Sequence, residues 1–460
     1  MNTQEMQDVL MLLENSVALT DGKVEIHNSA KLRATIHKLA EVSALESGAR
    51  QGLARYLTRL IALEAGIYPA SINELYLARG RGEVPANFTV PAINLRALSF
   101  DAARAVFRAA LPINAAAMIF EIARSEMGYT DQRPAEYVTS VLAAAIAEGY
   151  TGPVFIQGDH FQVSAKRYAA DPEAEIKAVK DLIVEAIGAG FYNIDIDTST
   201  LVDLSKSSIP EQQYLNTSLS AMFTAFIRSL EPKGCFISVG GEIGEVGGHN
   251  STEEELRAYM DGYIEELSKL APDACGISKI SIQTGTSHGG VVLPDGSIAK
   301  VNVDFDTLLR LSQIARKNYG LGGAVQHGAS TLPEDAFGKF VESEAVEVHL
   351  ATNFQNMLFD RLPQELRARM YAYLDEKSAS ERKPGMTDEQ FYYKTRKNAI
   401  GPFKKETWNL PAEKKAEIGK AWEEQFSKLF YLLGLTNTRK YIEQTIRPVA
   451  VKPSLKYYLG

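Results

Sequence analysis

The chain has 460 residues, of which 45% are hydrophobic and 23% are charged, and its formal net charge is −8. This composition is typical of a folded protein with a large core and argues against a disordered chain. The negative charge argues against a basic stripe of the kind that binds a nucleic-acid backbone, so we expect no nucleic-acid partner.

Cysteine content and hydropathy indicate the compartment. The two cysteines, Cys235 and Cys275, are too few for a disulfide framework and favour a reducing environment. The N-terminus lacks the basic and apolar regions of a signal peptide, and no long uncharged apolar run occurs. We therefore expect a cytoplasmic protein without membrane contact.

The N-terminal part of the chain has a helical pattern. Apolar residues recur at three- and four-residue spacing up to about Leu77, in QDVLMLLENSVAL, AKLRATIHKLAEVSAL and LARYLTRLIALEAGI. Pro85 and Pro91 then interrupt this pattern. The sequence predicts an N-terminal helical extension over residues 1–84.

Between residues 85 and 360, short β-rich runs alternate with helical stretches, which is the pattern of parallel βαβ units. The predicted strands are FTVPAIN, AAAMIFEI, GPVFIQGDH, FYNIDID, CFISVGGE, KISIQTG, GGAVQH and AVEVHLAT. Eight such strands predict an α/β protein with a (β/α)8 TIM barrel over residues 85–360. An open, doubly wound sheet with fewer strands is the alternative.

After residue 360 the pattern is helical again, which predicts a C-terminal helical extension over residues 361–460. Its segments ELRARMYAYLDEK and EKKAEIGKAWEEQFSKLFYLLG carry aromatic and charged faces without a recognisable site. We expect these helices to serve packing or subunit contacts.

Polar side chains gather at the ends of the predicted strands. Four histidines lie at or just after a strand end: His160, His288, His327 and His349. The acidic residues at such ends are Asp159, Asp195, Asp197 and Glu242. The carboxyl ends of barrel strands surround one mouth, where active sites lie, so we expect these side chains to converge.

Imidazole nitrogens together with a carboxylate suit zinc, and a catalytic zinc site leaves one coordination position open. One histidine at a strand end is more often structural than a ligand. Three histidines at three strand ends, each beside glycine or aspartate, predict a metal site.

Glycine-rich turns form a second pattern. They are GGEIGEVGG, the Gly289–Gly290 pair after His288, and Gly328 with Ser330 in HGAST. Such turns let a backbone approach a ligand, and their N–H groups can cradle an anion. Turns that bind nothing also select glycine, so each loop alone has two interpretations.

The motifs VPAIN, GDH, IDIDTS, GGEIGEVGG, GTSHGG and QHGASTLP occur in the order and approximate spacing of the class II fructose- and tagatose-bisphosphate aldolases. The chain resembles this family over residues 85–360. The resemblance implies a homo-oligomer, dimer or tetramer, that cleaves a phosphorylated ketose to dihydroxyacetone phosphate and an aldehyde with Zn²⁺.

The resemblance also implies roles for single residues. It makes His160, His288 and His327 the zinc ligands and Asp159 the acid/base residue at the aldehyde-derived oxygen. It places Glu242 and Asp197 near an alternative metal position. Loops around a substrate phosphate, often with a monovalent cation nearby, are implied at Gly247, Gly289, Gly328, Ser330 and Thr352.

Two positions depart from the family pattern. Asn250 in GGHNSTEEE stands where the family has an acidic residue on a mobile loop, and an amide cannot transfer that proton. His249 or one of Glu253–Glu255 could replace it. His349 stands where the family has an asparagine that contacts substrate, and could contact a different group, act as a replacement base or fill the mouth.

Three functions are consistent with these residues. The leading one is a zinc aldolase acting on a ketose phosphate or bisphosphate. A metal-dependent isomerase or epimerase could use the same enediolate chemistry, and altered proton transfer at Asn250 would fit it. A non-catalytic accessory barrel would be expected to lose the zinc ligands, which this chain keeps.

Arg167 or Lys206 on enlarged loops could decide whether a second phosphate is bound.

Overall fold

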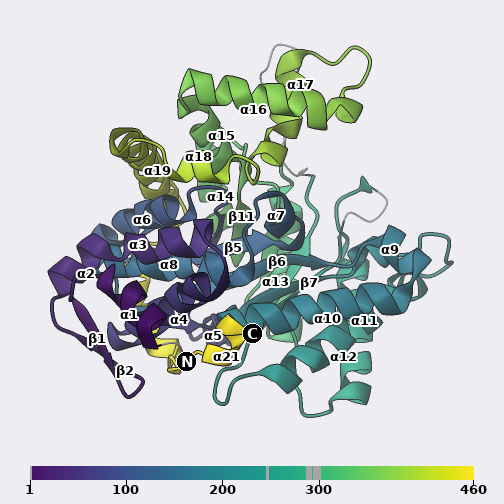
Figure 1. The fold of residues 1–460 in the computed structure, drawn as a ribbon. Helices are drawn as coiled ribbons and strands as arrows, with labels where there is room; N and C mark the ends of the chain where they lie inside the picture. The colour runs from purple at the N-terminus through teal and green to yellow at the C-terminus, as the bar shows by residue number, and fades with distance from the viewer. Residues whose placement is uncertain (1–2, 245–247, 286–292, 294–301) are drawn as a thin grey trace.

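Eight parallel strands close into a barrel in the computed structural model, which describes residues 3–244, 248–285, 293 and 302–460 (Figure 1). The strands are β4 (Val90–Asn94), β5 (Ile119–Ala123), β6 (Gly152–Gln162), β7 (Asn193–Asp197), β8 (Ser238–Glu242), β9 (Lys279–Ile282), β10 (Ala324–Gln326) and β11 (Glu347–Leu350). Each pairs with the next, and β11 pairs with β4. The predicted barrel and its eight strands are confirmed, and the open doubly wound sheet is wrong.

The barrel strands are buried on both faces. Every residue of β4, β5, β7, β9 and β11 is buried, as expected for parallel strands whose outer faces are covered by helices. The covering helices are α6 (Ser99–Ala110), α8 (Pro134–Glu148), α10 (Pro172–Ala189), α11 (Ile209–Leu230), α12 (Glu253–Leu270), α13 (Phe305–Tyr319), α14 (Phe337–Glu342) and α15 (Thr352–Arg361). Because the strands are buried on both faces, one layer of the core lies inside the barrel and a second lies between the strands and the helices.

Local signals fix the ends of these helices. At the start of α10, the Asp171 side chain accepts a hydrogen bond from Ala174 N, and Pro172 occupies the first turn. The helix ends at Gly190, which has a φ of 113° and can adopt it because it lacks a Cβ. The next strand therefore begins a few residues later, with its carboxyl end directed to the mouth.

The N-terminal segment holds the helices α1 (Thr3–Met11), α2 (Ser29–Thr35), α3 (His37–Leu45), α4 (Gly48–Glu64) and α5 (Asn73–Gly80). The predicted N-terminal helices are present, and the segment also holds three short strands, β1 (Val17–Thr20), β2 (Lys23–Ile26) and β3 (Ile67–Ala70). Asp21 and Gly22 join β1 to β2 with φ values of 51° and 75°, the two-residue hairpin turn that Asp-Gly favours.

The third of these strands is part of the barrel wall. β3 pairs in parallel with Gly152–Phe155 at the start of β6, and β7 pairs with the later part of β6, from Gln157 onwards. The Asn193 side chain joins the strands: its Oδ1 accepts from Ile72 N at 2.9 Å, and its Nδ2 donates to Ala70 O at 3.1 Å. β3 therefore fills the gap between β6 and β7 at the amino-terminal end of the barrel.

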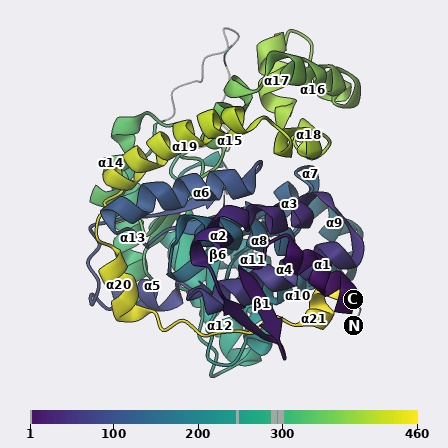
Figure 2. The same cartoon turned by 60° about the vertical axis from the view of Figure 1, so that its left-hand side comes forward.

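The C-terminal segment returns across the barrel and folds into α16 (Gln364–Lys377), α17 (Asp388–Thr395), α18 (Lys404–Trp408), α19 (Ala412–Leu432), α20 (Arg439–Thr445) and α21 (Leu455–Leu459). α19 packs along α6 and α15, where Trp422 Nε1 donates to Phe354 O at 3.1 Å (Figure 2). α16 and α17 stand at the end of the barrel where α7 (Arg124–Tyr129) and α15 begin (Figure 1). In the described part of the chain, no helix has both the length and the apolar character needed to span a membrane.

Candidate metal centre

A bulge in β6 brings Asp159 and His160 to the barrel mouth together. Side chains of consecutive strand residues normally alternate between faces, but the pairing of β6 with β7 shifts between Gly158 and Phe161, and His160 has a positive φ of 40°. The Phe161 ring lies against Gly158, where a Cβ would come within 2.3 Å of the ring. As a result, Asp159 Oδ1 lies 3.8 Å from His160 Nε2.

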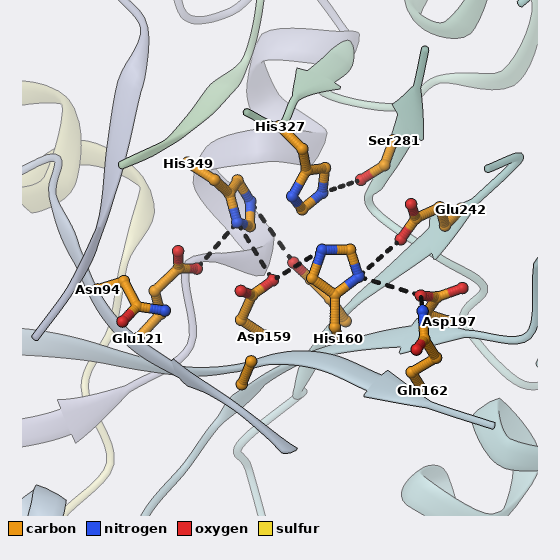
Figure 3. A network of polar contacts seen from close by, with 12 residues as sticks. Asn94, Glu121, Asp159, His160, Gln162, Asp197, Glu242, Ser281, His327 and His349 are labelled. Carbon is orange, nitrogen blue, oxygen red and sulfur yellow. Dashed lines mark hydrogen bonds and ion pairs between the residues drawn. The ribbon is translucent and has the colours of Figure 1, made fainter. Parts of the chain in front are cut away.

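Three histidine rings lie side by side at the mouth (Figure 3). The ring centroids of His160 and His327 are 4.4 Å apart, and those of His327 and His349 are 4.0 Å apart. They come from β6, from the residue after β10 and from β11, so strand ends bring them together. His288, implied as a zinc ligand by the family resemblance, lies outside the described residues.

Two carboxylates hold the ring of His160. Its Nδ1 lies 3.0 Å from Asp197 Oδ2 and 3.1 Å from Glu242 Oε2. Burial would lower the pKa of His160, but Asp159 and Glu242 raise it well above its ordinary value. Burial also raises the pKa of Glu242 to about 7, and the nearby Asp197 adds to that shift. These groups therefore carry an excess of negative charge around one imidazole.

A second group of carboxylates surrounds His349. Its Nδ1 lies 3.1 Å from Glu121 Oε2 and 3.3 Å from Asp159 Oδ1, and its Nε2 lies 2.7 Å from Glu347 Oε1. Burial opposes a charged ring, but Glu121 and Asp159 raise the pKa of His349 well above its ordinary value. Burial, aided by Asp159, raises the pKa of Glu121 to about 7.

The sequence pattern does not single out Glu121 and Glu347. Each is a charged residue within an otherwise apolar, fully buried strand, in IFEIA and EVHL. Since an isolated buried charge needs a partner, that contrast is the signal by which they could have been found.

The donor set fits a metal ion. Ligand atoms of His160, Glu242 and His327 lie within 4.8 Å of one another, as do those of Asp159, His327 and His349. Imidazole and carboxylate groups are the ligands that zinc prefers outside thiolate sites. Ser281 Oγ lies 3.0 Å from His327 Nε2, a contact of the kind that orients a ligand histidine. The residues present therefore fit Zn²⁺, with His327 common to both groups.

A cavity of about 1150 Å³ opens above the histidines. Gly328, Ser330 and Thr352 line its wall. Ser330 Oγ accepts a hydrogen bond from Ala351 N at 2.5 Å, and Thr352 begins α15. The amino-terminal turn of α15 therefore borders the cavity, and such a turn favours an anion. Gly247 and Gly289 lie outside the described residues.

Basic side chains form the rim of the cavity. Those from the barrel are Arg96, Arg124 and Arg167, and those from the C-terminal segment are Lys383, Lys394 and Lys397. The C-terminal segment, which we expected to serve packing or subunit contacts, thus also lines the cavity. Isolated lysines on helices look in sequence like a solvated face, so their gathering at a cavity is visible only in three dimensions.

Other candidate residues lie apart from the described wall of the cavity. His249 is exposed, with Nε2 3.7 Å from Glu255 Oε1. Asn250 Nδ2 donates to Asp304 Oδ2 at 3.1 Å. Lys206 pairs with Asp203 at 3.7 Å. None of the three is among the described residues that line the cavity, and Asp195 lies deeper in the barrel, where Lys279 binds it.

The chain matches one family of known proteins. The model of the class-II fructose-bisphosphate aldolase family matches residues 85–410, which extends past residue 360 to include α16, α17 and α18. A search of curated proteins gives no match.

Several solved structures are similar to this chain at low sequence identity. A fructuronate-tagaturonate epimerase from Cohnella laeviribosi has a TM-score of 0.54 and 13% identity, covering 92% of this chain and 90% of that one. The YdjI aldolase from Escherichia coli K12 gives 0.47 and 14%, covering 80% and 98%. A fructose-bisphosphate aldolase from Campylobacter jejuni gives 0.45 and 18%, covering 78% and 93%. With the family match over most of the chain, we conclude that this protein belongs to the class II fructose-bisphosphate aldolase family.

Proposed function

We propose that the protein is a zinc-dependent aldolase that reversibly cleaves a phosphorylated ketose to dihydroxyacetone phosphate and an aldehyde. The main support is the convergence of His160 and His327 with Asp159 at the barrel mouth, in a member of this family. We assign His160, His327 and, from the family resemblance, His288 as the zinc ligands, with Glu242 and Asp197 beside them.

Acid/base groups at the barrel mouth support this proposal. Bound Zn²⁺ would act as a Lewis acid at the substrate carbonyl and stabilise the negative charge that develops on the ketone-derived fragment. Asp159 accepts the proton of the hydroxyl whose carbon becomes the aldehyde, as the carbon–carbon bond breaks.

We assign the second proton transfer to His349. Its Nδ1 lies 3.3 Å from Asp159 Oδ1, and it borders the cavity. A protonated His349 donates to the carbon of the ketone-derived fragment, which completes dihydroxyacetone phosphate; the proton taken up by Asp159 balances the one given. This assignment supplies the proton that the amide of Asn250 cannot.

The charges of the cavity support an anionic substrate. We assign the turn of Gly328, Ser330 and Thr352 to one phosphate, with a monovalent cation nearby as the resemblance implies. Lys394 and Lys397, which also line the cavity, would bind a second anionic group of the sugar. A sugar bisphosphate or a sugar acid would satisfy both sides.

Epimerisation of such a sugar is the second candidate. Glu121 and Asp159 both lie within 3.3 Å of His349 Nδ1, which gives the mouth more acid/base groups than one cleavage step uses. The similarity to the Cohnella laeviribosi epimerase also includes the terminal helices, since it spans 92% of this chain. A carboxylate of a fructuronate or tagaturonate would suit the basic rim.

One assay separates the two candidates. The zinc-loaded protein is incubated with fructose and tagatose mono- and bisphosphates, and with fructuronate and tagaturonate, before and after chelation. Zinc-restored release of dihydroxyacetone phosphate supports the aldolase, and interconversion of the uronates without fragment release favours the epimerase. Asp159→Asn is the control, with an expected loss of about 10²–10⁴ in rate. No conversion of any compound by folded, zinc-loaded protein would contradict both candidates.

A further inference from the structure

Lys279 lies inside the barrel, beneath the histidines. It begins β9, and its side chain is 1% exposed. Its Nζ donates to Gln157 Oε1 at 2.7 Å and pairs with Asp195 Oδ1 at 2.9 Å and Glu347 Oε1 at 2.5 Å. The three donors of the ammonium thus meet acceptors from β6, β7 and β11, and none of the residues assigned above to the reaction is among them.

Glu347 connects this lysine to the cavity. Burial would raise its pKa, but Lys279 and His349 outweigh burial and hold the pKa of Glu347 at about 2. Its carboxylate also accepts hydrogen bonds from Tyr76 OH and from Gln157 Nε2. Since Glu347 and His349 are two residues apart in β11, both side chains point to the barrel interior. The carboxylate is therefore fixed from several sides and presents Oε1 to His349.

His349 has a different environment at each ring nitrogen. Nε2 faces Glu347 in the interior, and Nδ1 faces Asp159 and Glu121 at the mouth. A half-turn of the ring about its Cβ–Cγ bond would put Cδ2 in the place of Nδ1 and Cε1 in the place of Nε2, and that torsion has broad preferences of its own. On the interior side, only the observed orientation of the ring places a nitrogen against Glu347.

We propose that Lys279 and Glu347 are positioning residues that act through His349, holding its Nδ1 toward Asp159 at the cavity. The inference rests on the proposed function, in which His349 transfers a proton. Lys279 supplies the charge that keeps Glu347 and Asp195 together in the interior, because two buried carboxylates without a cation would repel. Glu347 in turn binds Nε2 and leaves Nδ1 for the reaction.

The same contacts distinguish this arrangement from a second metal site. Glu121, Glu347 and His349 have ligand atoms within 4.8 Å of one another, the spacing of a metal site. However, Glu347 Oε1 already lies 2.5 Å from the Lys279 ammonium. The Lys279 ammonium already neutralises Glu347, so a metal ion that binds Glu347 would have to displace this ammonium group.

A double-mutant cycle tests whether Glu347 acts through His349. Glu347→Gln keeps the size of the side chain, and His349→Asn introduces the residue usual in the family. We expect Glu347→Gln to lower kcat by about 10–100-fold, as for residues that orient a functional histidine, with KM and bound zinc unchanged. In the His349→Asn background, the same change should alter kcat by less than about twofold. Equal factors in both backgrounds would overturn the proposal.

A matched control measures the cost of losing a buried ion pair. Arg228 pairs with Glu231 at 2.5 Å, its side chain is 9% exposed, and it lies outside the described cavity wall. Arg228→Gln should lower Tm as Lys279→Gln does, but leave kcat within about twofold. If both variants lower kcat alike, Lys279 has only a structural role. If Lys279→Gln does not fold, Glu347→Gln still tests the positioning of His349, because it leaves the Lys279–Asp195 pair intact.

The orientation of the ring is measured independently of activity. In crystal structures of the zinc-loaded Lys279→Gln and Glu347→Gln variants, we expect the His349 ring to rotate away from residue 347. A ring that keeps its wild-type position in both overturns the proposal. If the wild-type protein neither cleaves nor epimerises any sugar, the proposed function fails, while these structures still test the positioning of His349.

Discussion

Asp159 Oδ1 lies 3.8 Å from His160 Nε2, although the two residues are consecutive in β6 and would point to opposite faces of a regular strand. The bulge between Gly158 and Phe161 removes this alternation. One strand therefore supplies both the proposed metal ligand and the proposed acid/base group, and their spacing depends on how Phe161 packs over Gly158.

Gly158→Ala should disrupt the site. The added Cβ would lie 2.3 Å from the Phe161 ring, so the bulge must shift. We expect a loss of about 1–3 kcal/mol in the free energy of unfolding, typical of overpacking, and reduced zinc content. Denaturant unfolding and metal analysis measure both. Gly338→Ala, where a Cβ meets nothing within 4 Å, is the control and should keep its zinc content without a loss of stability, because alanine suits a helix better than glycine. A Gly158→Ala variant with full zinc content would show that the bulge tolerates a side chain.

Zinc should stabilise the folded protein. A ligand that binds only the folded state adds about 2.7 kcal/mol when its free concentration is about 100 times Kd. Chelation should therefore lower Tm in a calorimetric scan, and added zinc should restore it. His327→Ala removes the histidine common to both candidate ligand groups, so its Tm should not respond to zinc. A zinc response of wild-type size in His327→Ala would place the metal elsewhere.

The lysines of α17 and the turn after it should act on substrate binding. Lys394→Ala and Lys397→Ala should each raise KM for an anionic sugar by about 3–10-fold with little change in kcat, because the contact is the same in ground state and transition state. The effect should shrink at high salt. Lys377→Ala, on α16 and outside the described cavity wall, should leave KM unchanged. Steady-state kinetics at two salt concentrations decide this, and unchanged KM in all three variants would contradict the assignment.

Glu136 should make stability depend on pH. It is buried, with Oε1 2.7 Å from Lys404 Nζ, and burial raises its pKa from 4.5 to about 7 even though Lys404 opposes the shift. The folded protein keeps the proton at pH values where the unfolded chain has lost it. Its contribution to stability is therefore present below about pH 4.5 and falls as pH rises to about 7.

The Glu136→Gln variant tests this contribution. Its unfolding free energy, measured by urea denaturation from pH 4.5 to 8, should depend less steeply on pH than that of the wild-type protein between pH 4.5 and 7. Parallel profiles for the two proteins would assign the dependence to other groups.

The strands could be predicted because each holds a short apolar run, and most of them end in a polar residue. GPVFIQGDH, for example, predicts a buried strand that ends in the pair Asp159–His160. The hairpin of β1 and β2 could also have been predicted from Asp21–Gly22, but the apolar spacing around it fits a helix equally well. The apolar residues there fit both the helix period and the strand period, and the Asp-Gly turn favours the two strands of a hairpin.

The interior ionic network and the basic rim could not be predicted in the same way. Lys279 begins one strand, and its partners Asp195 and Glu347 lie on two others, so the network exists only after the barrel closes. The same holds for Lys394, which reaches the cavity from a helix far along the chain. In the sequence these charged residues look isolated, because their partners lie in segments far away along the chain.

The position of β3 constrains the order in which the polypeptide can fold. During synthesis β3 leaves the ribosome before β4 and β5, yet its partner is the first part of β6. The backbone groups of Ile67–Ala70 therefore stay unpaired by other strands until β4, β5 and the first part of β6 have been made. Such a delayed, non-local pairing is slow and exposes a strand edge in the meantime. The segment before residue 85 cannot finish folding ahead of the barrel, and a fragment that starts at residue 85 would leave Gly152–Phe155 without this partner.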